Sequence, residues 1–216
     1  EKSISFFKKA IELNKNYILA YTNLGMAYVS LKNVPDAKES YLKAIEIDPN
    51  NLLANYNLAN LFKRLSDHEN SETYYKKSIE INPNHLASYN NIMDLYDKSN
   101  QNEKLDELIS AAEKIFKDNQ VISSFKAKLL YKNKKYKEVV TLLEKINFLP
   151  EQIIQKQASY EVLAKSYDKI GNYEKAFKLF QMLNDLMDQS KNRTVDKNIY
   201  IKTTKDRINF FNNPKI

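Results

Sequence analysis

The sequence predicts an all-α protein built from a repeated pair of helices. One seven-residue phrase occurs three times, as AIELNKN at 10–16, AIEIDPN at 44–50 and SIEINPN at 78–84, so consecutive copies start 34 residues apart. Between the copies, apolar residues are spaced by three and four positions, which is the spacing of one face of an α-helix. The 216 residues include only two glycines and five prolines. Turn-rich β architecture is therefore not expected.

Composition excludes several classes of protein. Hydrophobic residues make up 43% of the chain, which is enough for a core, yet no apolar run is long enough to span a membrane. Cysteine is absent, which excludes disulfides and thiolate sites. No signal-peptide pattern opens the sequence, and we expect a cytoplasmic location. Because residue 1 already lies in a helical pattern, we also expect this sequence to be part of a longer chain.

The first complete unit covers residues 18–51 and contains two helical stripes, at roughly 19–31 and 35–47. The segment KNVPD joins them, with Pro35 suited to the first turn of the second helix. Pro49 in the segment DPN cannot continue that helix. Gly25 and Ala44 are small, as two closely crossing helices require.

The apolar and small residues of this unit stand at positions 4, 7, 8, 11, 20, 24, 27 and 32. They are Tyr21, Leu24, Gly25, Tyr28, Ala37, Tyr41, Ala44 and Pro49. This pattern resembles the tetratricopeptide repeat, a helix–turn–helix unit of 34 residues. The resemblance implies a right-handed solenoid in which each helix pair packs on its neighbours. It also implies a concave groove lined by the first helix of each pair.

On this register the array occupies residues 1–190. It consists of a half unit at 1–17 and complete units at 18–51, 52–85, 86–119, 120–153 and 157–190. Four positions depart from the family pattern: Asn55 replaces an aromatic residue and weakens that contact, Met93 is bulky, Lys117 replaces proline, and Lys126 occupies a core position. Residues 191–216 are expected to form a C-terminal helix or linker, with an amphipathic helix at roughly 196–211 that leads to a further domain.

The sequence assigns no catalytic residue, no metal ligand and no cofactor to this chain. His68 and His85 both lie in predicted turns, and we interpret them as solvated, because metal sites need several clustered ligands. Gly25 and Gly171 lie in different units, so they cannot form a glycine-rich phosphate loop.

Asparagine recurs at position 6 of three consecutive units. Asn23, Asn57 and Asn91 are each 34 residues apart, which predicts a ladder along the inner wall of the groove. An amide offers both donors and an acceptor, which suits the backbone of an extended peptide. Similar ladders occur in tetratricopeptide proteins that bind extended peptides, including the sugar transferase that modifies Ser and Thr. The alternative is that asparagine at this position only caps a helix or holds water.

The other predicted groove residues would select the side chains of the peptide. They are Tyr56, Asn60, Lys63, Arg64 and Asn90. Asn60 and Asn91 also match the two asparagines of the carboxylate clamp in chaperone-binding members of the family. Val121 and Phe125 replace the Lys and Arg of that clamp, which is therefore broken. The predicted partner is a protein or peptide segment in extended conformation.

The net charge of +7 is concentrated in the fourth unit, where residues 120–149 contain seven Lys and two Glu. The centre of this basic region is YKNKKYK at 131–137, which includes Tyr131. Three interpretations stay open: a solvated lysine-rich turn, a site for an acidic protein, or a nucleic-acid site. No known nucleic-acid module is present.

The end of the array resembles the join between tetratricopeptide repeats and a sulfotransferase domain in certain bacterial proteins. Phe177, Phe180, Asn184 and Asp196 match that stretch. The resemblance implies a scaffold that recruits substrate for a sulfotransferase, whose donor would be 3′-phosphoadenosine-5′-phosphosulfate (PAPS). The loop that binds this donor is nowhere in residues 1–216. The alternatives are a stand-alone interaction adaptor and a nucleic-acid accessory.

Overall fold

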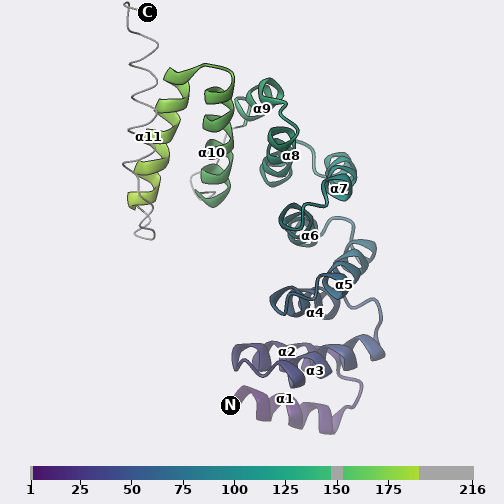
Figure 1. Ribbon diagram of the computed structural model, residues 1–216. Coiled ribbons are helices and arrows are strands. Elements are labelled where there is room, and N and C mark those ends of the chain that lie inside the picture. Colours follow the sequence, from purple (N-terminus) through teal and green to yellow (C-terminus); the bar gives the residue numbers. More distant parts are fainter. Residues whose placement is uncertain (1, 147–152, 190–216) are drawn as a thin grey trace, which may run out of the picture. The chain divides into compact units, whose positions relative to one another are not determined.

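The computed structural model describes residues 2–146 and 153–189, which are helical apart from short turns (Figure 1). These residues contain no β-strand, so the all-α class is confirmed. The helices are α1 (Lys2–Leu13), α2 (Ile18–Ser30), α3 (Val34–Ile47), α4 (Leu52–Arg64), α5 (His68–Ile81), α6 (Leu86–Lys98), α7 (Asn102–Ile115), α8 (Gln120–Lys132), α9 (Tyr136–Leu143), α10 (Ile153–Lys169) and α11 (Tyr173–Gln189).

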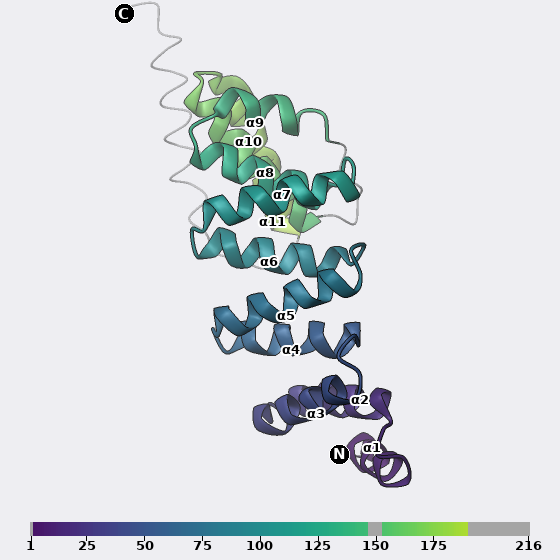
Figure 2. The same ribbon diagram turned by 90° about the vertical axis from the view of Figure 1, so that its right-hand side faces the viewer.

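The helices fall into two compact units. The first contains α1–α6 and ends at Gln101, and the second begins at Asn102 and contains α7–α11. Within the first unit, α2 packs on α3 and α4 packs on α5 as antiparallel hairpins (Figure 2). The boundary between the units falls inside the predicted repeat 86–119, between its two helices. The predicted C-terminal helix at 196–211 lies outside the described residues.

The phrase that recurs every 34 residues makes the same turn each time. The side-chain oxygens of Asn14, Asp48 and Asn82 each accept a hydrogen bond from the backbone N–H two residues later, at 3.0, 3.0 and 2.9 Å. Such a turn redirects the chain at the end of a helix. The first copy has Lys15 where the others have proline. The shared cause of the turn is therefore the side-chain oxygen rather than proline.

A second turn, inside each helical hairpin, places one residue in the left-handed region. The five residues are Lys32 (φ 59°), Ser66 (φ 60°), Asn100 (φ 55°), Lys134 (φ 60°) and Gly171 (φ 83°). The next residue then donates its N–H to a carbonyl five positions back, as Asn33 does to Tyr28 at 2.9 Å. This closes the last helical turn. Glycine adopts this conformation without the steric cost that a side chain brings.

We expect Lys134→Gly to raise the free energy of unfolding by about 0.5–1 kcal/mol. The Lys134 side chain is exposed, so the change mainly removes left-handed strain, partly offset by the greater freedom of glycine in the unfolded chain. Lys137→Gly, in the regular helix α9, is the matched control and should lower stability by up to about 1 kcal/mol. Urea denaturation followed by circular dichroism measures both changes. Shifts of the same sign in the two variants would contradict the turn geometry.

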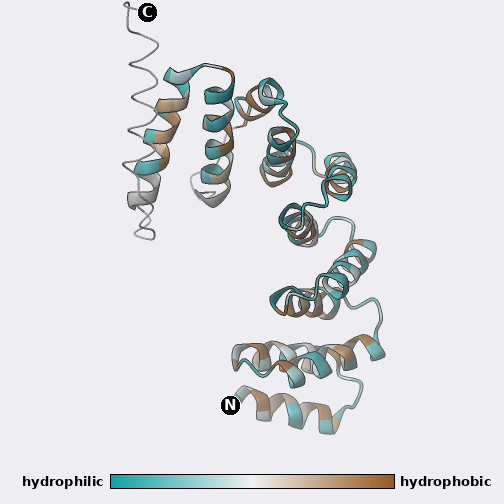
Figure 3. Cartoon of the chain, in the orientation of Figure 1, coloured by the Kyte–Doolittle hydropathy of each residue, from teal (hydrophilic) through white to brown (hydrophobic). Residues whose placement is uncertain are grey.

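Within each unit, apolar residues gather where neighbouring helices pack (Figure 3). In the first unit the core joins α2, α3 and α4 through Tyr28, Tyr41, Leu58 and Phe62, among others. The Tyr41 ring packs directly on Gly25, where an added Cβ would lie 2.5 Å from the Tyr41 Cε1 atom. This confirms that α2 and α3 cross closely at Gly25. Burial also raises the pKa of Tyr41 to about 12.

Two departures from the repeat pattern have their own partners. Asn55 is 1% exposed, and its Nδ2 donates to the carbonyl oxygens of Pro49 at 3.1 Å and Asn51 at 2.9 Å. In place of the aromatic contact that the repeat pattern expects, the Asn55 amide ties α4 to the turn before it. Lys126 is only half-buried, and its Nζ lies 2.8 Å from both carboxylate oxygens of Glu113 on α7.

Candidate functional site

The side-chain amides of the first two asparagines of the predicted ladder have no hydrogen-bond partner among the described residues, and we call them open amides. Asn23 lies on α2 and Asn57 lies on α4, at equivalent positions of consecutive repeats. Both side chains are partly exposed, and neither makes a hydrogen bond to any other described residue. Both amides can therefore offer their donors and acceptor to a ligand.

Exposed apolar side chains flank these two amides. Leu19 is 51% exposed, Met26 is 46% exposed and Leu53 is 52% exposed. Leu19, Asn23 and Met26 are spaced by four and three residues, so they lie on one face of α2. Leu53 has the same spacing to Asn57 on α4. We call this surface, made by these five residues, the asparagine face.

The sequence analysis missed the apolar part of the asparagine face. Leu19 and Leu53 are 34 residues apart, and that spacing was the signal that could have revealed them. Leucines in an amphipathic helix are ordinarily assigned to the core. The exposed fractions show that these two are not in the core.

The third asparagine is part of a network between α4 and α6. The Asn91 Nδ2 atom donates to the Tyr56 hydroxyl at 3.0 Å and to Asn60 Oδ1 at 3.2 Å. Its Oδ1 atom accepts from Lys63 Nζ at 3.2 Å. Both amide hydrogens of Asn91 are therefore in use. Unlike Asn23 and Asn57, Asn91 can offer a ligand only a remaining acceptor site.

The rest of the network neutralises its charges. Tyr75 donates its hydroxyl to Asn60 Oδ1 at 2.6 Å. Asp94 pairs with Lys63 at 2.7 Å and with Lys98 at 3.0 Å. Burial opposes ionisation of Asp94, but the hydrogen bonds from the two lysines outweigh it and hold the pKa of Asp94 below its ordinary value. Lys63 is thus a paired charge.

Two further predicted groove residues lie outside the network. The side chains of Arg64, at the end of α4, and Asn90, on α6, are both exposed. The structure therefore joins four of the eight predicted site residues in one network. Asn23 and Asn57 lie on the asparagine face with open amides. The side chains of Arg64 and Asn90 lie in solvent. The four joined residues are Tyr56, Asn60, Lys63 and Asn91.

His85 is a structural residue rather than a solvated turn residue. It precedes the first residue of α6, and its Nδ1 atom lies 2.8 Å from the Ser88 hydroxyl. Its ring meets the Tyr56 ring edge-on, with centroids 4.8 Å apart. His68, by contrast, is exposed at the start of α5.

We expect His85 to make the stability of the first unit depend on pH. Burial lowers the pKa of His85 below its ordinary value of 6.5, so the folded chain binds fewer protons than the unfolded chain. Its contribution is complete above about pH 6.5 and is lost as the pH falls toward the lower folded pKa. His85→Asn removes the titrating ring and puts a favoured residue at the N-cap position of α6. It should reduce the loss of stability between neutral and mildly acidic pH.

The measurement is urea denaturation at several pH values, with His68→Asn as the matched control. The control should retain the pH dependence of the unmodified chain. If both variants lose the same share of the pH dependence, the assignment of that dependence to His85 is wrong.

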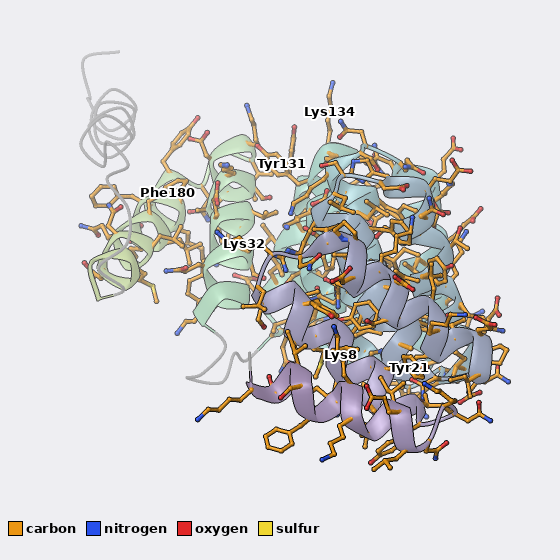
Figure 4. The ribbon with its side chains drawn as sticks, turned by 90° about the horizontal axis from the view of Figure 1, so that it is seen from below. Lys8, Tyr21, Lys32, Tyr131, Lys134 and Phe180 are labelled. Atoms are coloured by element: carbon orange, nitrogen blue, oxygen red, sulfur yellow. The ribbon has the colours of Figure 1, made fainter. Side chains whose placement is uncertain are left out.

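The basic turn between α8 and α9 exposes Lys132, Lys134, Lys135 and Lys137 (Figure 4). Tyr131 packs on Tyr136 with ring centroids 5.3 Å apart. Tyr131, on α8, thus packs on the first residue of α9.

The described residues also bear on metal binding and membrane insertion. No three His, Asp or Glu side chains among them come close enough together to hold a metal ion. None of their helices combines the length and apolar character needed to cross a membrane.

Two segments of the chain match a known family. Residues 18–51 and 53–85 match the tetratricopeptide repeat family. These units are therefore tetratricopeptide repeats. No curated protein matches the chain.

Solved structures show the same fold. The chain is similar to YrrB, described as a tetratricopeptide-repeat protein with an unusual peptide-binding site, at 17% identity and a TM-score of 0.67, covering 91% of this chain and 97% of YrrB. It is similar to MamA (residues 41 to the end) from Desulfovibrio magneticus RS-1, at 14% identity and a TM-score of 0.65, covering 82% and 97%. Yeast Tom70 matches at 22% identity and a TM-score of 0.70, covering 98% of this chain and 44% of Tom70. The chain thus shares the fold of these proteins.

Proposed function

We propose that this chain is an interaction scaffold that binds an extended segment of a partner polypeptide on the asparagine face. The observation that carries the proposal is the pair of open amides, Asn23 and Asn57, at equivalent places on consecutive repeats. Each amide can both donate to and accept from a peptide group. An extended chain exposes these groups regularly, so two equivalent rungs can hold one segment.

The flanking residues define the chemistry of the segment. Leu19, Met26 and Leu53 offer apolar contact beside the amides, so the bound segment should carry apolar side chains. The network around Asn91 fixes α4 against α6 and presents Asn57 on a rigid helix. YrrB, which shares the fold, has a peptide-binding site.

The test is a double substitution on the asparagine face. Each backbone hydrogen bond contributes roughly 0.5–1.5 kcal/mol, so Asn23→Ala with Asn57→Ala should weaken binding by roughly 1–3 kcal/mol. Peptides are first selected from a random display library against the unmodified chain, and the best is titrated by calorimetry against each variant. Lys134→Ala, on the basic turn, is the control and should bind as the unmodified chain does. Unchanged binding by the double variant, with loss in the control, would locate the working surface at the basic turn.

More specific roles stay predictions. The sulfotransferase association depends on sequence beyond Ile216. Phe177, Phe180 and Asn184 lie on α11, and Asp196 lies outside the described residues. We ascribe no catalytic step to residues 1–216, and PAPS would be bound only by such a further domain. The adaptor and nucleic-acid alternatives and the cytoplasmic location are likewise predictions.

A further inference from the structure

A small cleft of about 270 Å³ opens between α1, α2 and α3. Its floor is formed by three buried residues, Leu24, Tyr28 and Ser40. Its rim carries polar groups from all three helices, and Lys8 and Tyr21 are labelled in Figure 4. The rim residues are Lys8, Tyr21, Asp36, Glu39 and Lys43.

The cleft exists because one ring is missing from this repeat. In the next repeat, Tyr74 stacks on Phe62 with ring centroids 5.7 Å apart and an angle of 13° between the rings. Tyr28 and Ser40 hold the equivalent places, 34 residues earlier. Serine is too small to cover the Tyr28 ring. Every other unit of the array has a large apolar or aromatic residue at this position. These residues are Phe6, Tyr74, Leu108, Leu142 and Leu179.

Several rim charges already have partners. Lys43 pairs with Glu46 at 2.7 Å, and Asp36 accepts from Asn33 Nδ2 at 2.9 Å. Lys8 lies over the Tyr28 ring, with its Nζ 5.9 Å from the ring centroid.

Two acceptors at the rim are still open. The Glu39 carboxylate and the Tyr21 hydroxyl make no hydrogen bond to another described residue. Both can accept from an N–H group that enters beside the ring site. The cleft therefore combines an aromatic floor, over which the Lys8 side chain lies, with acceptors at its edge. An incoming ring would have to displace Lys8 from this position.

We propose that this cleft binds the aromatic side chain of a partner polypeptide. The ring stacks on Tyr28 as Tyr74 stacks on Phe62, and a backbone N–H next to it donates to Glu39. The volume is below the range typical of drug-sized ligands and suits a single ring.

This site is separate from the asparagine face. Tyr21 and Asn23 are two residues apart on α2, which places them about 200° apart around the helix axis. The cleft and the asparagine face therefore lie on opposite sides of α2. Loss of binding at one is distinguishable from loss at the other.

The probe is N-acetyl-tyrosinamide, titrated into the isotope-labelled chain and followed by the backbone amide NMR signals of Tyr28 and Glu39. We expect saturable shifts with the unmodified chain. Ser40→Leu should abolish them, because leucine fills this position in three other repeats. Ser30→Leu is the matched control, since Ser30 also bonds the carbonyl four residues back, at 3.1 Å against 2.7 Å for Ser40, but lies outside the cleft. It should bind as the unmodified chain does.

Two further experiments separate the contribution of ring stacking from that of the hydrogen bond to Glu39. Glu39→Leu removes the acceptor but keeps a side chain of similar size, and should weaken binding by roughly 2- to 12-fold, the loss expected for one hydrogen bond. N-acetyl-leucinamide should bind more weakly than the tyrosine probe, because it cannot stack. The proposal is overturned if the unmodified chain gives no saturable shift, if Ser40→Leu binds equally well, or if the two probes bind alike.

Discussion

Replacing Gly25 by leucine is expected to lower the free energy of unfolding by about 2 kcal/mol. The position has no room, because even a Cβ atom would lie 2.5 Å from a ring carbon of Tyr41. Tyr41 is 2% exposed and cannot move away without disturbing the contact between α2 and α3. Overpacking of this kind typically costs 1–3 kcal/mol and sometimes more. The better helix propensity of leucine offsets about 1 kcal/mol of that.

Gly25→Ala gives a sharper test of the same contact. On an exposed helix this change stabilises by about 1 kcal/mol, whereas here the clash should make it destabilising. Met26→Leu, one residue further on and exposed, is the control and should change stability by less than about 0.5 kcal/mol. All three are measured by urea denaturation. A stabilising Gly25→Ala would show that the helices do not cross closely at this point.

Replacing Asn55 by tyrosine, the residue at this position in three other repeats, is expected to destabilise the chain by about 2–4 kcal/mol. A comparison of repeats alone predicts the opposite, because the change restores the family pattern. The Asn55 side chain is buried, so a ring must displace its neighbours. The change also removes two hydrogen bonds, to Pro49 and Asn51, each worth about 1 kcal/mol.

The matched control is Asn57→Tyr on the same helix. Asn57 is partly exposed and without a hydrogen-bond partner among the described residues, so its stability change should stay below about 1 kcal/mol. Thermal and urea denaturation give both values. Equal stability of the Asn55→Tyr variant and the unmodified chain would mean that the amide does not hold the turn.

The sequence was sufficient to predict features that depend on the local spacing of residue types. The 34-residue period and the apolar spacing placed the helices of repeat 18–51, and the small size of Gly25 indicated a close crossing. Other features depend on which atoms meet across the fold. The turns made by Asn14, Asp48 and Asn82 and the hydrogen bonds of Asn55 could be identified only once the backbone atoms were in place. The contact of His85 with Tyr56 depends on how two helices pack.

The same distinction applies to the candidate site. The equal spacing of Asn23, Asn57 and Asn91 suggested three equivalent rungs. Asn91 differs because Tyr56, Asn60 and Lys63, which lie 28 to 35 residues earlier, take up its amide. A repeat pattern treats equivalent positions as identical, whereas their neighbours differ from one repeat to the next. The exposure of Leu19, Met26 and Leu53 likewise depends on what the folded chain leaves uncovered.

The most direct test of the asparagine face is to locate a bound peptide by NMR. The side-chain amides of Asn23 and Asn57 give their own signals, so their involvement can be observed without any substitution. A peptide selected on the unmodified chain should shift both signals and the backbone signals of Leu19 and Leu53, and should leave the Lys134 turn unchanged. Shifts confined to the turn around Lys134, with both asparagine side-chain signals unmoved, would contradict the proposed function.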